Sequence, residues 1–195
     1  MDSIRNEIEQ ELLLKELELL DSQREYIYKE GRSILVLFPK IFAMLHQGQV
    51  NNAKENLIIL RKRLEELLSK TDFRWRKYLL PAQIEYVEAI VYLSIIEEFR
   101  IPSYKEVGFE IEPYLLGLLD CVGELRRSVY DKINEKNFEK ASFFYKSMKE
   151  IFDNLSSFSY FDNAVPSLRR KVDLARRLIE ETYVDITKIN VLGIQ

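Results

Sequence analysis

Hydrophobic residues recur at helical spacing along most of this chain. From residue 3 to residue 47 the apolar positions lie three or four residues apart for most of the segment, which places them on one face of an α-helix. Gly31 and Pro39 mark expected bends in this segment, and Gly48 marks its end. The amino-terminal quarter of the chain is therefore predicted to be helical.

Further helices are expected after this segment. Asn51 or Asn52 can cap a helix that runs to about residue 70, and Asp72 can begin another that reaches residue 80 before Pro81 interrupts it. The remaining predicted helices cover residues 82–99, 112–130, 137–155 and 166–187. No internal repeat or low-complexity linker is present in the sequence. We therefore predict an all-α bundle of six or seven helices that forms a single domain over residues 1–195.

The composition agrees with a globular helical protein. The 195 residues are 47% hydrophobic and 31% charged, and five prolines and six glycines leave little turn chemistry for a strand-rich fold. The single cysteine, Cys121, cannot form a disulfide within the chain, and the amino terminus is too charged to begin a secretory signal. No apolar run reaches the roughly 20 residues that cross a bilayer. We expect a cytoplasmic protein without a membrane partner.

The charge balance does not by itself predict a nucleic-acid partner. A net charge of −3 gives no global attraction to a polyanion, so local basic clusters would have to supply it. Such clusters are most often solvated faces of helices. They occur at residues 61–63, 74–77, 126–127, 169–171 and 176–177.

One of the most apolar segments, IEYVEAIVYLSII at residues 84–96, carries two glutamates. Glu85, Glu88 and Tyr92 fall within about 60° on one face of a helix, since each residue advances the helix by roughly 100°. No basic residue lies within four positions of either glutamate. Their partner must come from elsewhere, either as an arginine of another helix or as a bound cation.

A second apolar helix carries another acidic pair. In PYLLGLLDCVGELRRS, Asp120 and Glu124 lie on one face, with Gly117 one turn before and Gly123 beside them. Glycine inside a helix costs about 0.5 to 1 kcal/mol relative to alanine, which suggests that another backbone or a ligand comes close. An ion pair with Arg127 on the same helix would satisfy both acids without any ligand.

Convergence of the two acidic pairs would favour a bound metal ion. Four carboxylates without a counter-ion would repel one another, and a divalent cation removes that conflict. Oxygen-only sites suit Mg²⁺ or Mn²⁺ better than zinc, and the only histidine, His46, leaves no cluster of nitrogen ligands. His46 is more often a hydrogen-bonding residue at a helix end than a general base, and the apolar setting of Cys121 argues against a nucleophile. Ion pairing remains the alternative explanation of the acids.

At these residues the sequence resembles the translin superfamily, in particular translin-associated factor X and its archaeal relatives. PYLLGLLDCVGELRRS resembles the signature helix of that family, and QIEYVEAIVY resembles its glutamate-bearing helix. GRSILVLFPKIFAMLHQG and SLRRKVDLARRLIEETYVDI add support. The resemblance runs in consistent order from about residue 24 to residue 186, although only the two acidic helices are sharply diagnostic.

The resemblance implies a seven-helix bundle that assembles into a hollow barrel, commonly an octamer. Such a barrel encloses single-stranded RNA and cuts it with Mg²⁺-dependent endonuclease chemistry. Translin proper, the non-catalytic branch, is expected to have apolar residues where this chain has Glu85 and Glu88. The resemblance assigns both metal binding and catalysis to Glu85, Glu88, Asp120 and Glu124. It also implies phosphate contacts by Arg74, Arg76, Lys77, Arg126 and Arg127.

Three functional hypotheses follow. The first is an endoribonuclease that uses carboxylate-bound Mg²⁺ or Mn²⁺ to cleave single-stranded RNA inside a homo-oligomeric barrel. The second is a translin-like barrel that binds single-stranded DNA or RNA without cutting it, with its acids engaged by internal basic partners. The third, a helical scaffold without a nucleic-acid role, leaves the two acidic pairs unexplained.

Overall fold

The computed structural model describes residues 2–191, with side chains for residues 9–188, and within these ranges every regular element is a helix. Seven α-helices have nine residues or more, and one is a single turn. The α-helices are α1 (Asp2–Leu35), α2 (Phe38–His46), α3 (Val50–Lys70), α4 (Leu80–Glu98), α5 (Tyr104–Val107), α6 (Ile111–Asn134), α7 (Phe138–Leu155) and α8 (Leu168–Val191). The 3-10 helices are η1 (Phe73–Tyr78) and η2 (Ser156–Phe161). The predicted all-α bundle is confirmed.

The first long segment breaks at residues 36–37 rather than at Gly31. Gly31 lies inside α1 because a close contact requires it there: a Cβ at this position would lie 2.8 Å from the carbonyl oxygen of Tyr78. Pro39 lies in the first turn of α2. Proline is tolerated there because N–H groups in the first turn form no hydrogen bond within the helix. Gly48 ends the segment as predicted, with a φ of 74° that few other residues adopt.

The predicted helix starts are partly confirmed. α3 begins one residue before Asn51 and has no side-chain cap, so the predicted capping role of Asn51 or Asn52 is wrong. Asp72 does cap the next element, because its carboxylate accepts from the Arg74 N–H, but that element is the 3-10 helix η1. Pro81 lies in the first turn of α4 instead of interrupting a helix. The later predicted boundaries lie within about four residues of the observed ones.

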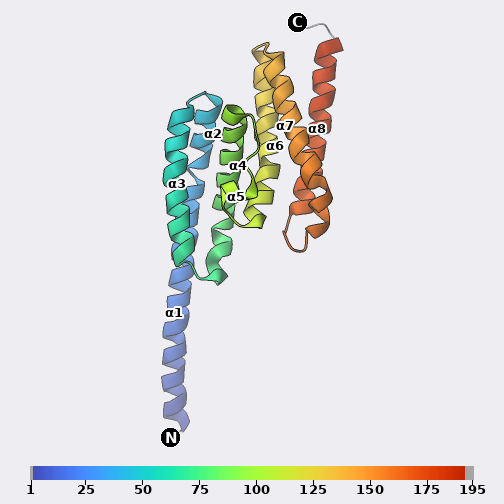
Figure 1. Ribbon diagram of the computed structural model, residues 1–195. Coiled ribbons are helices and arrows are strands. Elements are labelled where there is room, and N and C mark those ends of the chain that lie inside the picture. The colour runs from blue at the N-terminus through green and yellow to red at the C-terminus, as the bar shows by residue number, and fades with distance from the viewer. Residues whose placement is uncertain (1, 192–195) are drawn as a thin grey trace.

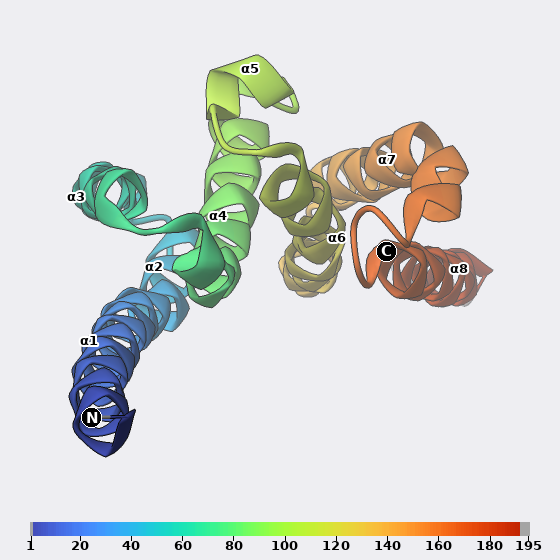
Figure 2. The ribbon, with the colours of Figure 1, turned by 90° about the horizontal axis from the view of Figure 1, so that it is seen from below.

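Helices α4 and α6 lie side by side at the centre of the molecule and run in the same direction (Figures 1 and 2). The segment between them, which contains α5, returns the chain to the starting end. α1, α2 and α3 pack on α4, while α7 and α8 pack on α6. Eleven of the 19 residues of α4 are buried, which explains why its sequence is apolar on every side.

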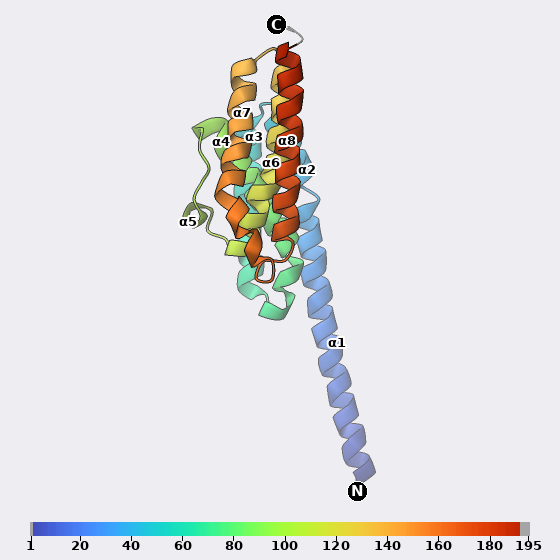
Figure 3. The same ribbon diagram turned by 90° about the vertical axis from the view of Figure 1, so that its right-hand side faces the viewer.

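The amino-terminal half of α1 extends away from the rest of the molecule (Figures 1 and 3). Its leucines are more than half exposed, although leucine is among the residues most often buried. The exposed leucines are Leu12, Leu13, Leu14, Leu17 and Leu19. No helix in residues 2–191 is long and apolar enough to cross a membrane.

Candidate functional site

A close contact between α4 and α6 brings the two acidic helices together. At Gly117 of α6 a Cβ would lie 2.6 Å from the Cβ of Val87 and 2.8 Å from the carbonyl oxygen of Ile84. Only glycine allows this approach, so the predicted close backbone contact is confirmed there. At Gly123 no other backbone comes close, since nothing in the described part of the chain lies within 4 Å of such a Cβ, and the approach of a ligand there stays a prediction.

The four predicted carboxylates form one electrostatic cluster. Glu88 is buried, with 8% of its surface exposed, and Glu85 is half-buried on the same face of α4. Burial and the charges of the three other acids raise the pKa of Glu88 to about 9. Burial, then Asp120 and Glu124, also raise the pKa of Glu85. The acidic pairs of α4 and α6 therefore lie close enough to oppose each other's ionisation.

Two of the four acids have partners from other helices. Asp120 forms an ion pair with Lys171 of α8, whose side chain is only 17% exposed. Glu124 accepts a short hydrogen bond of 2.5 Å from Nε2 of His46, the last residue of α2. The predicted intrahelical pair with Arg127 is wrong. Arg127 is exposed and forms no ion pair with any side chain of residues 9–188.

Lys171 also affects the ionisation of the two glutamates of α4. Its positive charge lowers the pKa of both Glu85 and Glu88, although burial and the other acids outweigh it. Neither glutamate forms an ion pair with an arginine among the side chains that the structure describes. The predicted alternative for this pair, an ion pair with an arginine of another helix, is therefore wrong. The positive charge that acts on both glutamates belongs to Lys171 of α8.

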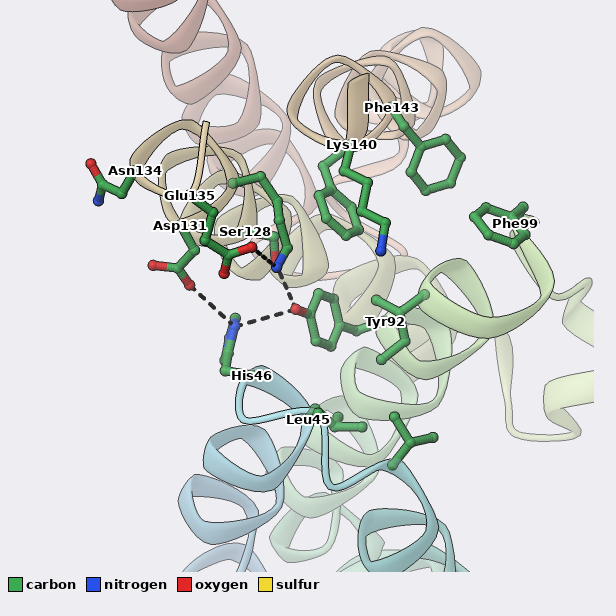
Figure 4. A pocket seen from close by; sticks show the side chains of 15 residues that line it. Leu45, His46, Tyr92, Phe99, Ser128, Asp131, Asn134, Glu135, Lys140 and Phe143 are labelled. Carbon is green, nitrogen blue, oxygen red and sulfur yellow. Dashed lines mark hydrogen bonds and ion pairs between the residues drawn. The ribbon is translucent and has the colours of Figure 1, made fainter. Parts of the chain in front are cut away.

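On its other side, His46 faces Tyr92 of α4 and Asp131 of α6 (Figure 4). Its Nδ1 lies 3.3 Å from the Tyr92 hydroxyl and 3.7 Å from Oδ2 of Asp131. The Tyr92 hydroxyl also lies 2.6 Å from the Ser128 hydroxyl. A proton on Nε2 is needed to donate to Glu124. The expectation of a hydrogen-bonding residue at a helix end is confirmed.

The sequence reasoning missed both partners of the acids. Lys171 belongs to a basic run at residues 169–171, and such runs are most often solvated faces of helices. It lies between Leu168 and Val172, two fully buried positions of α8, and this apolar spacing was a usable signal. The pairing of His46 with Glu124 had no such signal, since 78 residues separate them. Cys121 is fully buried beside the acids, and burial raises the pKa of its thiol as expected.

The chemistry of the cluster suits a hard cation. Four carboxylates supply only oxygen ligands, which Mg²⁺ and Mn²⁺ prefer. Within the described residues, no three acidic, histidine or cysteine side chains surround one point closely enough to hold an ion as they stand. Lys171 supplies the positive charge at Asp120 in this arrangement. The donor types therefore suit such an ion, whereas the described side chains, as they are placed, do not form a site for it.

The first predicted group of phosphate contacts lies on η1, immediately before α4. Arg74 is about half exposed and pairs with Asp72 beside it. Arg76 is similarly exposed, and its Nη1 lies 3.5 Å from a carboxylate oxygen of Glu110. The Lys77 amine lies 5.3 Å from the ring centroid of its neighbour, Tyr78. These three cations are accessible and only weakly engaged, since exposed ion pairs contribute little stability.

The second predicted group consists of two neighbours on α6 with different surroundings. Arg126 faces α8, where it pairs with Glu181 at 3.0 Å and donates to the Tyr130 hydroxyl. Arg127 is exposed on the side of α6 that carries Asp120, since seven residues make about two helical turns. Arg127 is therefore the more accessible of the two on the face of α6 that carries Asp120.

Comparison with known proteins connects the chain to one family over most of its length. The model of the Translin family matches residues 22–182. An uncharacterized protein of Methanocaldococcus jannaschii, MJ0175, is 34% identical over 169 residues, which is 85% of this chain and 76% of that protein.

Solved structures are similar over nearly the whole chain. The crystal structure of AfC3PO is 30% identical, with a TM-score of 0.82 over 95% of this chain and 98% of that chain. The structure of AfC3PO with duplex RNA has 29% identity and a TM-score of 0.81 over the same shares. The crystal structure of apo-NeC3PO, at 23% identity and a TM-score of 0.76 over 89% and 92% of the two chains, shares the fold.

Proposed function

Because this chain belongs to the Translin family, we propose that it is a metal-dependent endoribonuclease that cleaves single-stranded RNA. The observation that carries the proposal is the cluster of four carboxylates from α4 and α6 beside a close helix contact. The similarity to AfC3PO, which has been solved with duplex RNA, supports RNA as the ligand. A cluster of acids that oppose each other's ionisation is a typical candidate for a functional site.

We assign metal binding to Glu85, Glu88, Asp120 and Glu124. Mg²⁺ or Mn²⁺ bound by their oxygens would supply a Lewis acid that activates water and stabilises charge on the phosphate. The side chains around the acids then have two tasks. His46 holds the Glu124 carboxylate in one orientation, as outer partners of metal ligands commonly do. Lys171, released from Asp120, is placed to neutralise a backbone phosphate.

We further propose that several copies of the chain enclose the RNA in a barrel, with eight as the expected number. The exposed leucines of α1 support this part of the proposal, because an isolated chain would leave them in water. Phosphate contacts are assigned to Arg74, Arg76, Lys77, Arg126 and Arg127, of which Arg126 must first leave Glu181.

The test is cleavage of end-labelled RNA by the full chain. Single-stranded and duplex forms of one sequence are incubated with Mg²⁺, with Mn²⁺ or with EDTA. We expect cleavage of the single strand with either metal and none with EDTA. Because changes in outer partners of metal ligands already cost about 10- to 100-fold, Glu88→Ala and Asp120→Asn should lower the rate by at least about 100-fold. Glu98→Gln, an exposed change on the same helix, should not alter the rate.

A second candidate function is RNA binding without cleavage. The specific observation in its favour is that Lys171 and His46 already engage two of the four acids. In that case the chain binds labelled RNA equally well with Mg²⁺ and with EDTA, and the RNA stays intact. Cleavage that persists in EDTA, or in both acidic variants, would overturn the metal-dependent assignment itself.

A further inference from the structure

A cavity of about 520 Å³ lies beyond the acidic cluster, towards the carboxyl ends of α4 and α6. His46, which contacts Glu124, lines this cavity together with Tyr92 (Figure 4). The rest of the wall comes from α6, α7, the end of α4 and the segment that joins α2 to α3. Seven residues of α6 separate Glu124 from Asp131 in the cavity wall, which is about 10 Å along the helix. The wall of the cavity therefore lies about two helical turns beyond Glu124.

One side of the cavity is aromatic. Phe99 and Phe143 meet edge to face, with ring centroids 5.3 Å apart and an interplanar angle of 69°. Phe99 is 68% exposed, so packing within the chain does not explain a large apolar ring at this position. Its backbone is left-handed, with a φ of 55°, at the end of α4 where glycine is usual. An exposed ring at the mouth of a cavity is available to stack on a ligand.

The other side of the cavity is polar. The Asp131 side chain is 48% exposed, and an ionised carboxylate only accepts hydrogen bonds. The amine of Lys140 points into the cavity beside Phe99 and Tyr92 (Figure 4). Lys140 forms no ion pair with any side chain in residues 9–188, so its charge is available. Lys132 and Glu135 also line the cavity, but they pair with each other at 2.6 Å. The wall thus combines an aromatic surface, a carboxylate acceptor and a cation without an ion-pair partner among residues 9–188.

We propose that this cavity binds one unpaired base of the RNA, and that it prefers bases with an amino group over uracil. Aromatic side chains stack on unpaired bases, and polar groups read their Watson–Crick edges. Asp131 would accept from the amino groups of guanine, adenine or cytosine. Uracil has no amino group and offers only its N3–H, which lies between two carbonyl oxygens that repel a carboxylate. Lys140 would contact the phosphate of the same nucleotide. The inference rests on the proposed RNA substrate. It adds a site for one base of that RNA next to the acidic cluster.

The experiment measures binding in EDTA, where no cleavage interferes. Fluorescent short oligouridines carry uracil, cytosine, adenine or guanine at one central position, and each is titrated with the full chain. The three amino-bearing oligonucleotides should bind about fivefold tighter or more than oligouridine. Asp131→Asn should remove this preference, because an amide both donates and accepts. Phe99→Ala should weaken binding of every oligonucleotide by about fivefold or more, and Phe99→Tyr should restore it.

Two matched variants control for general effects. Phe138→Ala removes an exposed ring on α7. This ring lines a different cavity with Tyr145 and Tyr183. Glu139→Gln removes an exposed carboxylate next to Lys140. Both should keep the affinity order of the four oligonucleotides, and circular dichroism should show all variants folded.

Each outcome bears on the inference separately from catalysis. Equal affinity for the four oligonucleotides, or an unchanged preference in Asp131→Asn, overturns it, as does a failure to bind any of them. A protein that shows the preference but cuts no RNA supports the base-binding cavity and overturns the endonuclease. A protein that cuts RNA but shows no such preference supports the endonuclease and overturns the base-binding cavity.

Discussion

Folding takes the carboxyl group of Glu88 out of water and places it beside three other acids. Its pKa rises from the ordinary 4.5 to about 9, with burial as the larger cause. Between these two values the folded protein holds a proton that the unfolded chain has released. Stability in the absence of metal therefore falls as the pH rises through this window, because the folded state binds more protons.

Glu88→Gln should remove this pH dependence. In EDTA the variant should be more stable than the natural chain at pH 8 by about 1 to 3 kcal/mol, because a pKa shift of one unit corresponds to about 1.4 kcal/mol. At pH 5 the two should be nearly equal. Urea unfolding at both pH values measures the difference, with Glu98→Gln on the exposed side of α4 as the control. An identical pH profile in Glu88→Gln would show that this carboxyl is not protonated in the fold.

Lys171→Met should make the protein depend on a divalent cation for its stability. Loss of the ammonium leaves Asp120 unpaired and strengthens the repulsion among the acids, so the free energy of unfolding in EDTA should fall by about 1 to 4 kcal/mol. Mn²⁺ should restore more stability in this variant than in the natural chain, because it replaces the missing charge. Thermal unfolding in EDTA and in MnCl₂ measures both effects. Equal gains from Mn²⁺ in the two proteins would argue against an ion at these residues.

At the scale of residues, the sequence predicted that the two acidic pairs lie near each other, but not which side chains of other helices contact them. The two acidic pairs stand out because charged residues in apolar helices need a partner. The pairs Asp120–Lys171 and His46–Glu124 join residues 51 and 78 positions apart. Such contacts depend on how whole helices pack, which local spacing does not determine. Whether the four carboxylates bind a metal stays a prediction.

At the scale of elements, the contact between α4 and α6 depends on Gly117. Gly117→Ala should push the helices apart and lower the free energy of unfolding by about 1 to 3 kcal/mol, the usual cost of overpacking. Gly123→Ala, on the same helix but facing open space, should instead raise it by about 0.5 to 1 kcal/mol through helix propensity. Chemical denaturation of the two variants measures both changes. The explanation fails if both substitutions shift stability in the same direction.

The extent of the helices was largely predictable, whereas their breaks were not. Periodic apolar positions predicted the long helices because burial of one face repeats along the whole element. Glycine inside a helical segment predicts a bend at Gly31, but this residue instead allows a close approach to the backbone of Tyr78 in another element. Likewise, η1 follows a real cap at Asp72, yet its tighter turn is not visible in the spacing of its side chains. The positions at which helices end or tighten therefore depend on contacts between elements, which the sequence of one segment does not determine.

At the scale of the whole molecule, the exposed leucines of α1 bear on assembly. A double substitution, Leu12→Glu with Leu19→Glu, should leave each chain folded but lower the mass of the assembly in solution, because it puts charges on the apolar surface. Light scattering after size-exclusion chromatography measures the mass. Lys15→Glu on the same segment changes the net charge by the same amount and should leave the mass unchanged. An unaltered mass in the double variant would place the contact between copies elsewhere.

The extended half of α1 also has a consequence for backbone amides. Between residues 9 and 19 every side chain is exposed, so in a separate chain this stretch relies on its own hydrogen bonds. Isolated helices of about 12 to 15 residues or fewer are marginal in water. Its amide hydrogens should therefore exchange with deuterium quickly at high dilution and slowly once another copy covers them. The exchange rate of this one stretch would report what fraction of the chains has assembled.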